Sequence, residues 1–416
     1  GQDIKTMLRI IQIYGRIGGD EVMDLLWGKI DYPDKRILSE VLLALSQCGF
    51  QAKDDKVIRI KRAIEKDISN TAWNIAALAE IGEDATADNL RQALIEENEH
   101  NHDHLYMLLS LIYDAHSIQL VRNNIESGTI EGVTFALELL NVFIDDDMKQ
   151  ILFPLLDEMP HDEKLERLQV HFPREKLNGV DILKHIINRD YNSTNRYTKA
   201  LAMCKFFLLP EVKVTDDLIA NLFNPDPLLR ETAAWAIYLI NKEEYHKHTS
   251  RISKAYKHEL DRILLSAGGD EDMRVWKILF LKNIEVFSKI PGVILAELAE
   301  SFEETTFRKG ETVIAKENSG NIPIFIIVKG KLTFEDNREV ILKENDIMGV
   351  TLVLDSDSYP SSIIASEESL LYRIEKDKFY DMMSSHYEMA EGVIHNITGK
   401  FGKDEVEEGI EIGVAS

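Results

Sequence analysis

The sequence has only two cysteines in 416 residues, and neither lies in a spacing that binds a metal or forms a redox motif. Cys48 and Cys204 stand alone inside apolar segments, so we expect a reducing compartment and no disulfide framework. No run of about eighteen apolar residues occurs, and the start shows no basic segment followed by an apolar one. The sequence therefore predicts a soluble, cytoplasmic stretch of chain without a signal peptide or a membrane span.

Positive charge is also scarce. The 48 Lys and Arg residues face 72 Asp and Glu residues, which gives a net charge of −24. Such a surface repels phosphate backbones and anionic lipid, so we expect no nucleic-acid partner and no direct insertion into a membrane. Hydrophobic residues make up 44% of the chain, enough for a large core and for two to four domains.

Recognisable catalytic motifs are missing as well. Gly15-Arg16-Ile17-Gly18-Gly19 has neither the preceding strand nor the Lys of a phosphate-binding loop, and a turn between helices explains it. No Ser lies in a Gly-x-Ser-x-Gly elbow, and neither cysteine has a His partner in a nucleophile context. We therefore predict that the chain is not an enzyme and holds no cofactor.

The histidine-rich stretch from Glu97 to His104 is a candidate metal site, because His100, His102 and His104 alternate with acidic and amide residues. Its spacing fits no closed structural metal site. We interpret it as a solvated loop between two helices and predict no metal there, with a metal site as the alternative.

From residue 4 to about 287 the hydrophobic pattern is helical, in blocks of 10–18 residues separated by short polar breaks. Pairs of blocks recur about every 40 residues, as expected for antiparallel helical hairpins. The predicted pairs are Leu8–Gly18 with Glu21–Ile30, Ala72–Ile81 with Ala87–Ile95, His104–Tyr113 with Ser117–Ile125, Ile130–Phe143 with Met148–Leu156, and Thr194–Leu208 with Asp216–Leu222.

The best-defined unit runs from Asn224 to Ile237. Asp226 can cap a helix, Pro227 fits its first turn, and Arg230 follows. An Asp in the turn and a basic residue in the second helix resemble the HEAT repeat, and Tyr32–Arg36 shows the same theme. The resemblance implies an α-solenoid of HEAT-like hairpins, whose concave surface usually contacts proteins.

The pattern changes after an acidic, Gly-containing stretch. Two further helices are expected at 275–287 and 292–301, followed by short strands and then by helices at 376–385 and 388–401. The expected strands are Glu311–Ala315, Ile322–Val328, Lys331–Glu335, Glu339–Leu342, Ser362–Ser366 and Leu370–Ile374. We therefore predict a mainly α chain with a HEAT-like solenoid at 1–266, a linker at 267–274, a small α+β domain at 275–402 and an acidic, disordered tail at 403–416.

The α+β part resembles the cyclic-nucleotide-binding domain family in its turn glycines, Gly310 and Gly330, and in the alternating strand from Ile324 to Val328. The resemblance implies an antiparallel β-roll flanked by helices. It also implies a phosphate-binding cassette, Gly-Asp-x-Phe-Gly-Glu, whose Glu accepts a hydrogen bond from the ribose, and a later Arg that pairs with the phosphate.

Here the cassette reads Asn345-Asp346-Ile347-Met348-Gly349-Val350-Thr351-Leu352, so Val350 stands at the position of the Glu. Tyr359 or Ser361 falls at the position of the Arg, and no Lys or Arg occurs from Glu344 to Tyr372. We expect the pocket not to bind cAMP or cGMP, because a buried phosphate would lack a partner. The residues predicted to line this altered pocket are Gly349, Val350, Thr351, Tyr359, Ser361 and Ser362.

The helices His104–Asp114 and Thr134–Leu140, followed by Phe153–Leu156, resemble the soluble C-terminal region of bacterial ATP/ADP translocase-like transporters of the major facilitator class. The chain begins without Met and enters helical periodicity at once, so we expect it to be part of a longer protein. The hypothesis is a non-catalytic regulatory or interaction module that contacts a protein partner or its own upstream membrane domain, which would tether it to the inner membrane. A small-molecule sensor acting through the β-roll and a free-standing protein-binding adaptor are the alternatives.

Overall fold

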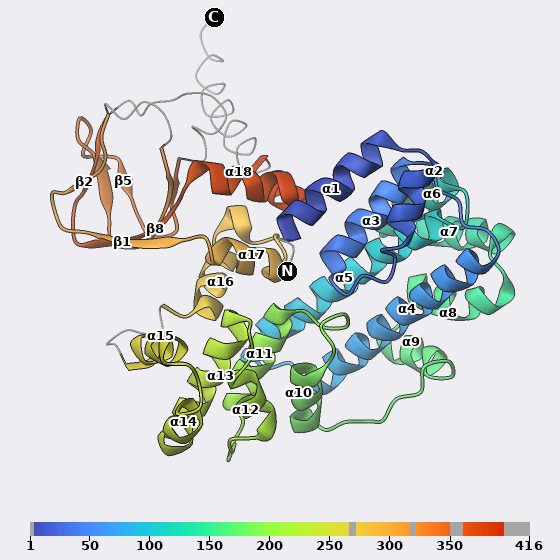
Figure 1. Ribbon diagram of the computed structural model, residues 1–416, viewed down its shortest axis with the longest axis horizontal. Helices are drawn as coiled ribbons and strands as arrows, with labels where there is room; N and C mark the ends of the chain where they lie inside the picture. Colours follow the sequence, from blue (N-terminus) through green and yellow to red (C-terminus); the bar gives the residue numbers. More distant parts are fainter. Residues whose placement is uncertain (1–3, 266–271, 317–321, 350–360, 395–416) are drawn as a thin grey trace, which may run out of the picture. The chain divides into compact units, whose positions relative to one another are not determined.

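The structure is a computed structural model, and it describes residues 4–265, 272–316, 322–349 and 361–394 (Figure 1). The chain divides into two compact units, Gly1–Leu218 and Ile219–Ser416. It is mainly helical, with antiparallel β-sheets near the C-terminal end. Within the described residues, no helix is both long enough and apolar enough to cross a membrane.

The described part of the first unit consists of helices and their connections. They are α1 (Ile4–Ile17), α2 (Asp20–Trp27), α3 (Lys35–Gln47), α4 (Asp55–Ile81), α5 (Asp88–Ser110), α6 (Ala115–Glu126), α7 (Ile130–Phe143), α8 (Asp146–Leu156), α9 (His161–Leu168), α10 (Gly179–Asn188) and α11 (Arg196–Phe207). Pairs close in sequence pack together, among them α1 with α3, α4 with α5, α6 with α7 and α10 with α11. Apolar residues of α1 to α9, such as Leu45, Ile64 and Leu109, form a common core.

Short polar side chains fix where several helices begin. Asp34 accepts a hydrogen bond from the Arg36 amide, and Asn195 accepts from the amides of Tyr197 and Thr198. Asp226 accepts from the Leu228 amide at 2.9 Å, with Pro227 at the first helical position. The predicted cap at Asp226 is therefore confirmed.

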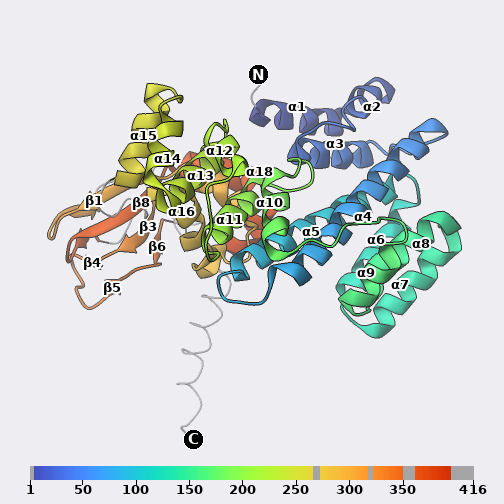
Figure 2. The ribbon, with the colours of Figure 1, turned by 90° about the horizontal axis from the view of Figure 1, so that it is seen from below.

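One predicted loop is wrong. The stretch Glu97–His104 lies in the middle of α5, a continuous helix of 23 residues that runs beside the 27-residue α4 (Figures 1 and 2). Its polar composition predicted exposure to solvent, yet the side chains of Glu97, Asn101 and His104 are buried. Helix is possible there because every one of these side chains finds a buried partner.

We call this set of contacts the polar seam of α4 and α5. His104 Nδ1 lies 2.5 Å from Asp67 Oδ2, and Asn101 donates to Thr71 Oγ1 at 3.3 Å. Glu97 Oε1 accepts from the Thr198 hydroxyl at 2.9 Å and from the Asn195 amide at 2.7 Å, at the start of α11. Residues that the sequence predicts to be exposed therefore join α4, α5 and α11.

The second unit adds helices on either side of the strands. They are α12 (Asp216–Leu222, across the border between the units), α13 (Pro227–Ile240), α14 (Lys242–Thr249), α15 (Lys254–Leu265), α16 (Arg274–Lys282), the 3-10 turn η2 (Glu285–Phe287), α17 (Gly292–Ala299) and α18 (Lys376–Ser385). Residues 387–394 are also helical, and the rest of the helix predicted at 388–401 lies outside the described residues.

The unit boundary differs from the predicted domain border at residue 266. Helices α13 to α15, which the sequence groups with the repeats, belong to the same compact unit as the strands. Glu231 on α13 pairs with Arg274 on α16, and Trp235 packs edge-on against Trp276 at 5.6 Å between ring centroids. These contacts bind α13 to the helix that leads into the β-sheets.

The strands form two four-stranded antiparallel sheets, ordered β1-β8-β3-β6 and β2-β7-β4-β5. Apolar side chains such as Phe325, Ile327, Leu332 and Leu371 form the core of this β-roll. The strands are β1 (Glu303–Phe307), β2 (Thr312–Ile314), β3 (Ile324–Lys329), β4 (Leu332–Phe334), β5 (Ile341–Leu342), β6 (Ile347–Met348), β7 (Ile363–Ala365) and β8 (Ser369–Ile374). The sequence predicts all of them except β1 and β6.

Asp67→Ala should lower the free energy of unfolding by about 3 kcal/mol, because it leaves the buried ring of His104 without its partner. Glu65→Ala, at an exposed position of the same helix, is the matched control and should change stability by about 0.5 kcal/mol or less. Urea unfolding of the two variants measures the difference. Equal losses would mean that the Asp67–His104 contact contributes no stability.

Stability should also fall on mild acidification. Burial, with Lys35 nearby, lowers the pKa of His100 to about 4, and burial, with Lys164 nearby, lowers the pKa of His102 to about 4. Because both values lie below the ordinary value of 6.5, the unfolded chain binds more protons between pH 6.5 and 4. This contribution to stability is complete above pH 6.5 and is lost toward pH 4.

Thermal melts at pH 7.5 and 5 measure this loss. His102→Gln should show a smaller decrease in melting temperature between the two pH values than the unmodified chain, because it removes one of the two titrating groups. An unchanged decrease would rule out His102 as a source of the acid sensitivity.

Candidate functional site

The β-roll holds the residues predicted to line a ligand pocket. Gly349 follows β6 in one sheet, whereas Ser361 and Ser362 precede β7 in the other. Val350, Thr351 and Tyr359 lie outside the described residues. The geometry of the site therefore rests on the two segments that lead into the cassette and out of it.

The segment leading in is a tight turn attached to β3. Asn345 has a φ of 74°, and its amide donates to the Ile327 carbonyl at 2.9 Å. In return, the Ile327 amide donates to the carbonyl of Asp346 at 3.0 Å, and the Asp346 carboxylate accepts from the Lys343 amide at 2.8 Å. This turn directs the chain to the point where β3 begins.

Gly349 lies where that chain passes closest to β3. Its φ is 96°, and a Cβ atom placed there would lie 3.1 Å from the Pro323 carbonyl oxygen and 3.2 Å from Ile324 Cα. A side chain would therefore meet both backbone strain and backbone atoms. The packing of the β-roll explains this glycine without any ligand.

The two serines on the way out are engaged with the backbone. Ser361 is buried, and its hydroxyl accepts from the Asp336 amide at 3.1 Å. The Ser362 hydroxyl accepts from the Lys316 amide at 3.2 Å, and the Ser362 carbonyl accepts from the Glu335 amide at 2.8 Å. Both hydroxyls thus tie the start of β7 to the neighbouring segments, and the Ser361 hydroxyl also donates to the Ser362 carbonyl at 3.4 Å.

The charge around this segment does not favour an anion. The sequence has no Lys or Arg from Glu344 to Tyr372. Among the described residues, exposed Lys343 directly precedes this stretch, and Arg373, which directly follows it, pairs with Glu303 and Glu375. A cyclic phosphate at the cassette would therefore find no Lys or Arg within the stretch itself.

A second cluster, which the sequence did not single out, surrounds Arg189 in the first unit. The guanidinium stacks 3.8 Å from the ring centre of Trp73 and donates to Asn74 at 3.0 Å and Asn70 at 2.9 Å. Burial lowers the pKa of Arg189 to about 10 and that of the neighbouring Lys199 to about 8. Lys199 Nζ donates to the Arg189 carbonyl, so this cluster joins α4 to α11.

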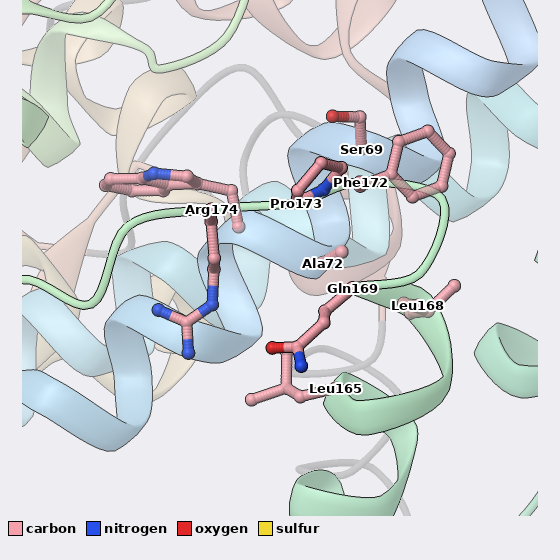
Figure 3. A pocket seen from close by; sticks show the side chains of 9 residues that line it. Ser69, Ala72, Leu165, Leu168, Gln169, Phe172, Pro173 and Arg174 are labelled. Carbon is pink, nitrogen blue, oxygen red and sulfur yellow. The ribbon is translucent and has the colours of Figure 1, made fainter.

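Trp73 also lines a small pocket between α4, α9 and the segment after α9 (Figure 3). Its other walls include Phe172 and Arg174, and Arg174 is ion-paired with Glu80 at 2.9 Å. The cavity of about 100 Å³ is well below the 300–1,000 Å³ of typical small-molecule sites. It has room for a single side chain and not for a nucleotide.

The candidate metal site is not supported. The described residues contain no group of three or more His, Cys, Asp or Glu side chains arranged to hold a metal ion. His104, the most deeply buried of the three histidines, is directed to Asp67.

Comparison with known proteins identifies one domain. Residues 304–386 match the family model of the cyclic nucleotide-binding domain. The chain is similar to the N-terminal domain of a transcriptional regulator from Streptomyces coelicolor A3(2), with 18% identity over 31% of this chain and 94% of that chain and a TM-score of 0.28. The sensor domain of the transcriptional regulator DNR from Pseudomonas aeruginosa is 16% identical over 31% of this chain and 96% of that chain, with a TM-score of 0.27.

A third similar structure is a variant of the regulatory subunit of a cAMP-independent protein kinase A from Trypanosoma brucei, bound to cAMP. It is 18% identical over 34% of this chain and 52% of that chain, with a TM-score of 0.26. The family match confirms the predicted cyclic-nucleotide-binding fold in the C-terminal part of the chain.

Gly349→Ala should destabilise the chain by about 2–3 kcal/mol through strain and contact with Pro323. Gly310→Ala is the matched control, because Gly310 has a similar φ of 88° but a methyl group placed there would meet no atom within 4 Å. The control should lose only about 1 kcal/mol from backbone strain. Chemical unfolding measures both, and equal losses would show that the contact with β3 has no cost.

Proposed function

We propose that this chain is a non-catalytic regulatory module in which a cyclic-nucleotide-binding-type β-roll acts on the helices attached to it. The observation that carries the proposal is the domain at residues 304–386 together with its connection to α16. Such a domain suggests a regulatory or sensor role. For a signal to leave the β-roll, the roll must be mechanically joined to another element.

Helix α16 provides that joint on its β-roll side. Lys277 pairs with Glu304 on β1 and lies 5.4 Å from the ring centre of Tyr372 on β8. Phe280 packs edge-on against Tyr372 at 5.7 Å, and Phe302 stacks on the same ring at 5.3 Å. A change in the position of β1 and β8 would therefore move α16.

The same helix is joined to α13 through its first turn. Arg274 pairs with the buried carboxylate of Glu231, and Trp276 packs against Trp235. Removing one partner of such a buried pair typically costs about 3–5 kcal/mol, so this connection resists separation. The proposed path runs from the β-roll through α16 to α13.

We further propose that the pocket does not bind cyclic nucleotides tightly. The support is the replacement of the ribose-binding Glu by Val350, the absence of an Arg at Tyr359 or Ser361, and the engagement of Ser361 and Ser362 with backbone amides. Each lost charged hydrogen bond typically weakens binding by about 10- to 100-fold. The β-roll would then act through protein contacts.

A small-molecule sensor is the second candidate. The family match favours it, because the matched fold is that of a ligand-binding domain. A ligand suited to this chain would be uncharged, given the local lack of cations, and would have to bind one arrangement of the helices better than another.

The wider role proposed for the chain follows the sequence resemblances. The helical first unit would present HEAT-like hairpins to a protein partner, and the whole would belong to a translocase-like transporter as its regulatory part. The support is the succession of packed helix pairs and the resemblance of His104–Asp114 and Thr134–Leu140. A genomic reading frame that encodes no membrane helices would exclude the transporter part.

Calorimetric titration with cAMP, cGMP, ATP and ADP, supported by thermal melts, tests the pocket. We expect no saturable binding, whereas a ligand at 100 times its dissociation constant would add about 2.7 kcal/mol of stability. Saturable binding of a cyclic nucleotide to the unmodified chain would contradict the proposal.

The variant Val350→Glu with Tyr359→Arg restores the two family residues and should gain cAMP affinity. Val340→Glu with Val170→Arg introduces the same charges at exposed positions and is the matched control. This control should show no gain in cAMP affinity. If neither variant gained affinity for cAMP, restoring these two residues would not be sufficient to make the pocket a cAMP-binding site.

A further inference from the structure

Helix α1 has an exposed apolar stripe with basic residues along one side. Ile10, Ile13 and Ile17 are 41%, 54% and 67% exposed, while Ile11 and Gly15 on the opposite face are buried. In heptad notation Ile10 and Ile17 occupy a positions and Ile13 the d position between them. Arg9 and Arg16 are then both g positions beside the stripe, and both are exposed.

Helix α7 has a matching stripe with acidic residues along one side. Phe135 and Val142 are 50% and 82% exposed, and Leu139 between them is half-buried. Phe135 and Val142 take d positions and Leu139 the a position. Glu131 and Glu138 are both g positions, and both are exposed.

The two stripes fit each other in antiparallel orientation. The spacing of three and then four residues from Ile10 to Ile17 equals the spacing from Val142 back to Phe135. Each a residue therefore meets a d residue, as Ile13 with Leu139 does. Turning one helix end for end also puts the g positions of both helices on the same side, where the arginines face the glutamates.

We propose that α1 of one copy of this chain docks on α7 of a second copy. The charges select this partner, because α1 contains Lys and Arg but no acid, whereas α7 contains acids but no base. A membrane surface suits α1 less well, because a chain of net charge −24 is repelled by anionic lipid. Within one copy, α1 and α7 lie apart in both views of the first unit (Figures 1 and 2).

The contact uses a different surface on each partner, so a dimer formed by one such contact still has one unused α1 and one unused α7. Such a heterologous contact builds chains or rings rather than stopping at a dimer. One helix from each copy makes an interface at the small end of the specific range, so we expect association on the order of 10 µM. This inference is independent of whether the β-roll binds a ligand.

Sedimentation velocity of charge-reversed variants tests the proposal. Arg9→Glu with Arg16→Glu makes both stripes acidic, and Glu131→Lys with Glu138→Lys makes both basic. We expect the unmodified chain to associate as its concentration rises from 1 to 100 µM and each variant alone to weaken that association at least tenfold. An equimolar mixture of the two variants should associate again.

Restored association in the mixture separates docking from misfolding, because a misfolded variant would not regain it. Lys53→Glu with Lys66→Glu reverses two exposed charges away from both stripes and should associate like the unmodified chain. A monomeric unmodified chain at 100 µM, or a mixture that stays monomeric, would overturn the proposal.

Discussion

The first unit depends on the pairing of polar side chains buried between its two longest helices. An unpaired buried polar group costs about 1–3 kcal/mol, so the packing of α4 on α5 favours the register in which these side chains face one another. Asp67 with His104 and Thr71 with Asn101 hold that register, and Glu97 extends it to the start of α11. Arg189 at the end of α10, stacked on Trp73 and bonded to Asn70 and Asn74, extends these polar contacts of α4 to a fourth helix. Hydrogen bonds with fixed geometry therefore determine which helices meet, while the apolar core around Ile64 and Leu109 supplies the bulk of the burial.

The second unit combines a family fold with side chains that serve that fold. Gly349 permits a close passage past β3, and the serines at the start of β7 hold neighbouring backbone amides. Charged groups also meet where α16 contacts β1. Burial and the hydrogen bond from Asp272 to Glu304 raise the pKa of Asp272. Lys277 lowers the pKa of Glu304 despite the opposite effect of burial. Among the described residues of this unit, α16 is thus joined to the sheet by both charged and aromatic contacts.

Local sequence signals predicted much of this structure, and long-range pairing accounts for what they missed. Alternating apolar residues located β3 and β8 closely, and Asp226 with Pro227 located the start of α13, because both signals act within a few residues. Strands β1 and β6 were not predicted, because Glu303–Phe307 is largely polar and Ile347–Met348 is too short to show a pattern. Strand β1 forms by pairing with β8, and β6 forms by pairing with β3. The sequence also failed to predict that α5 is one continuous helix, because the partners of Glu97 and His104 lie 37 or more residues away along the chain. Of the candidate pocket, the sequence placed Gly349 in the cassette, but it could not predict the close approach of Gly349 to β3 or the engagement of Ser361 by Asp336.

Helix α4 has a further consequence through its length alone. At 27 residues it spans about 40 Å, and along that span it contacts α5, α8, α9 and α10. Inserting or deleting one residue near its middle would rotate everything beyond that point by about 100°. Asn70 and Asn74 would then turn away from Arg189 while the earlier turns kept their neighbours. Natural variation in the length of this protein should therefore accumulate in the connections on either side of α4, leaving the number of residues within the helix unchanged.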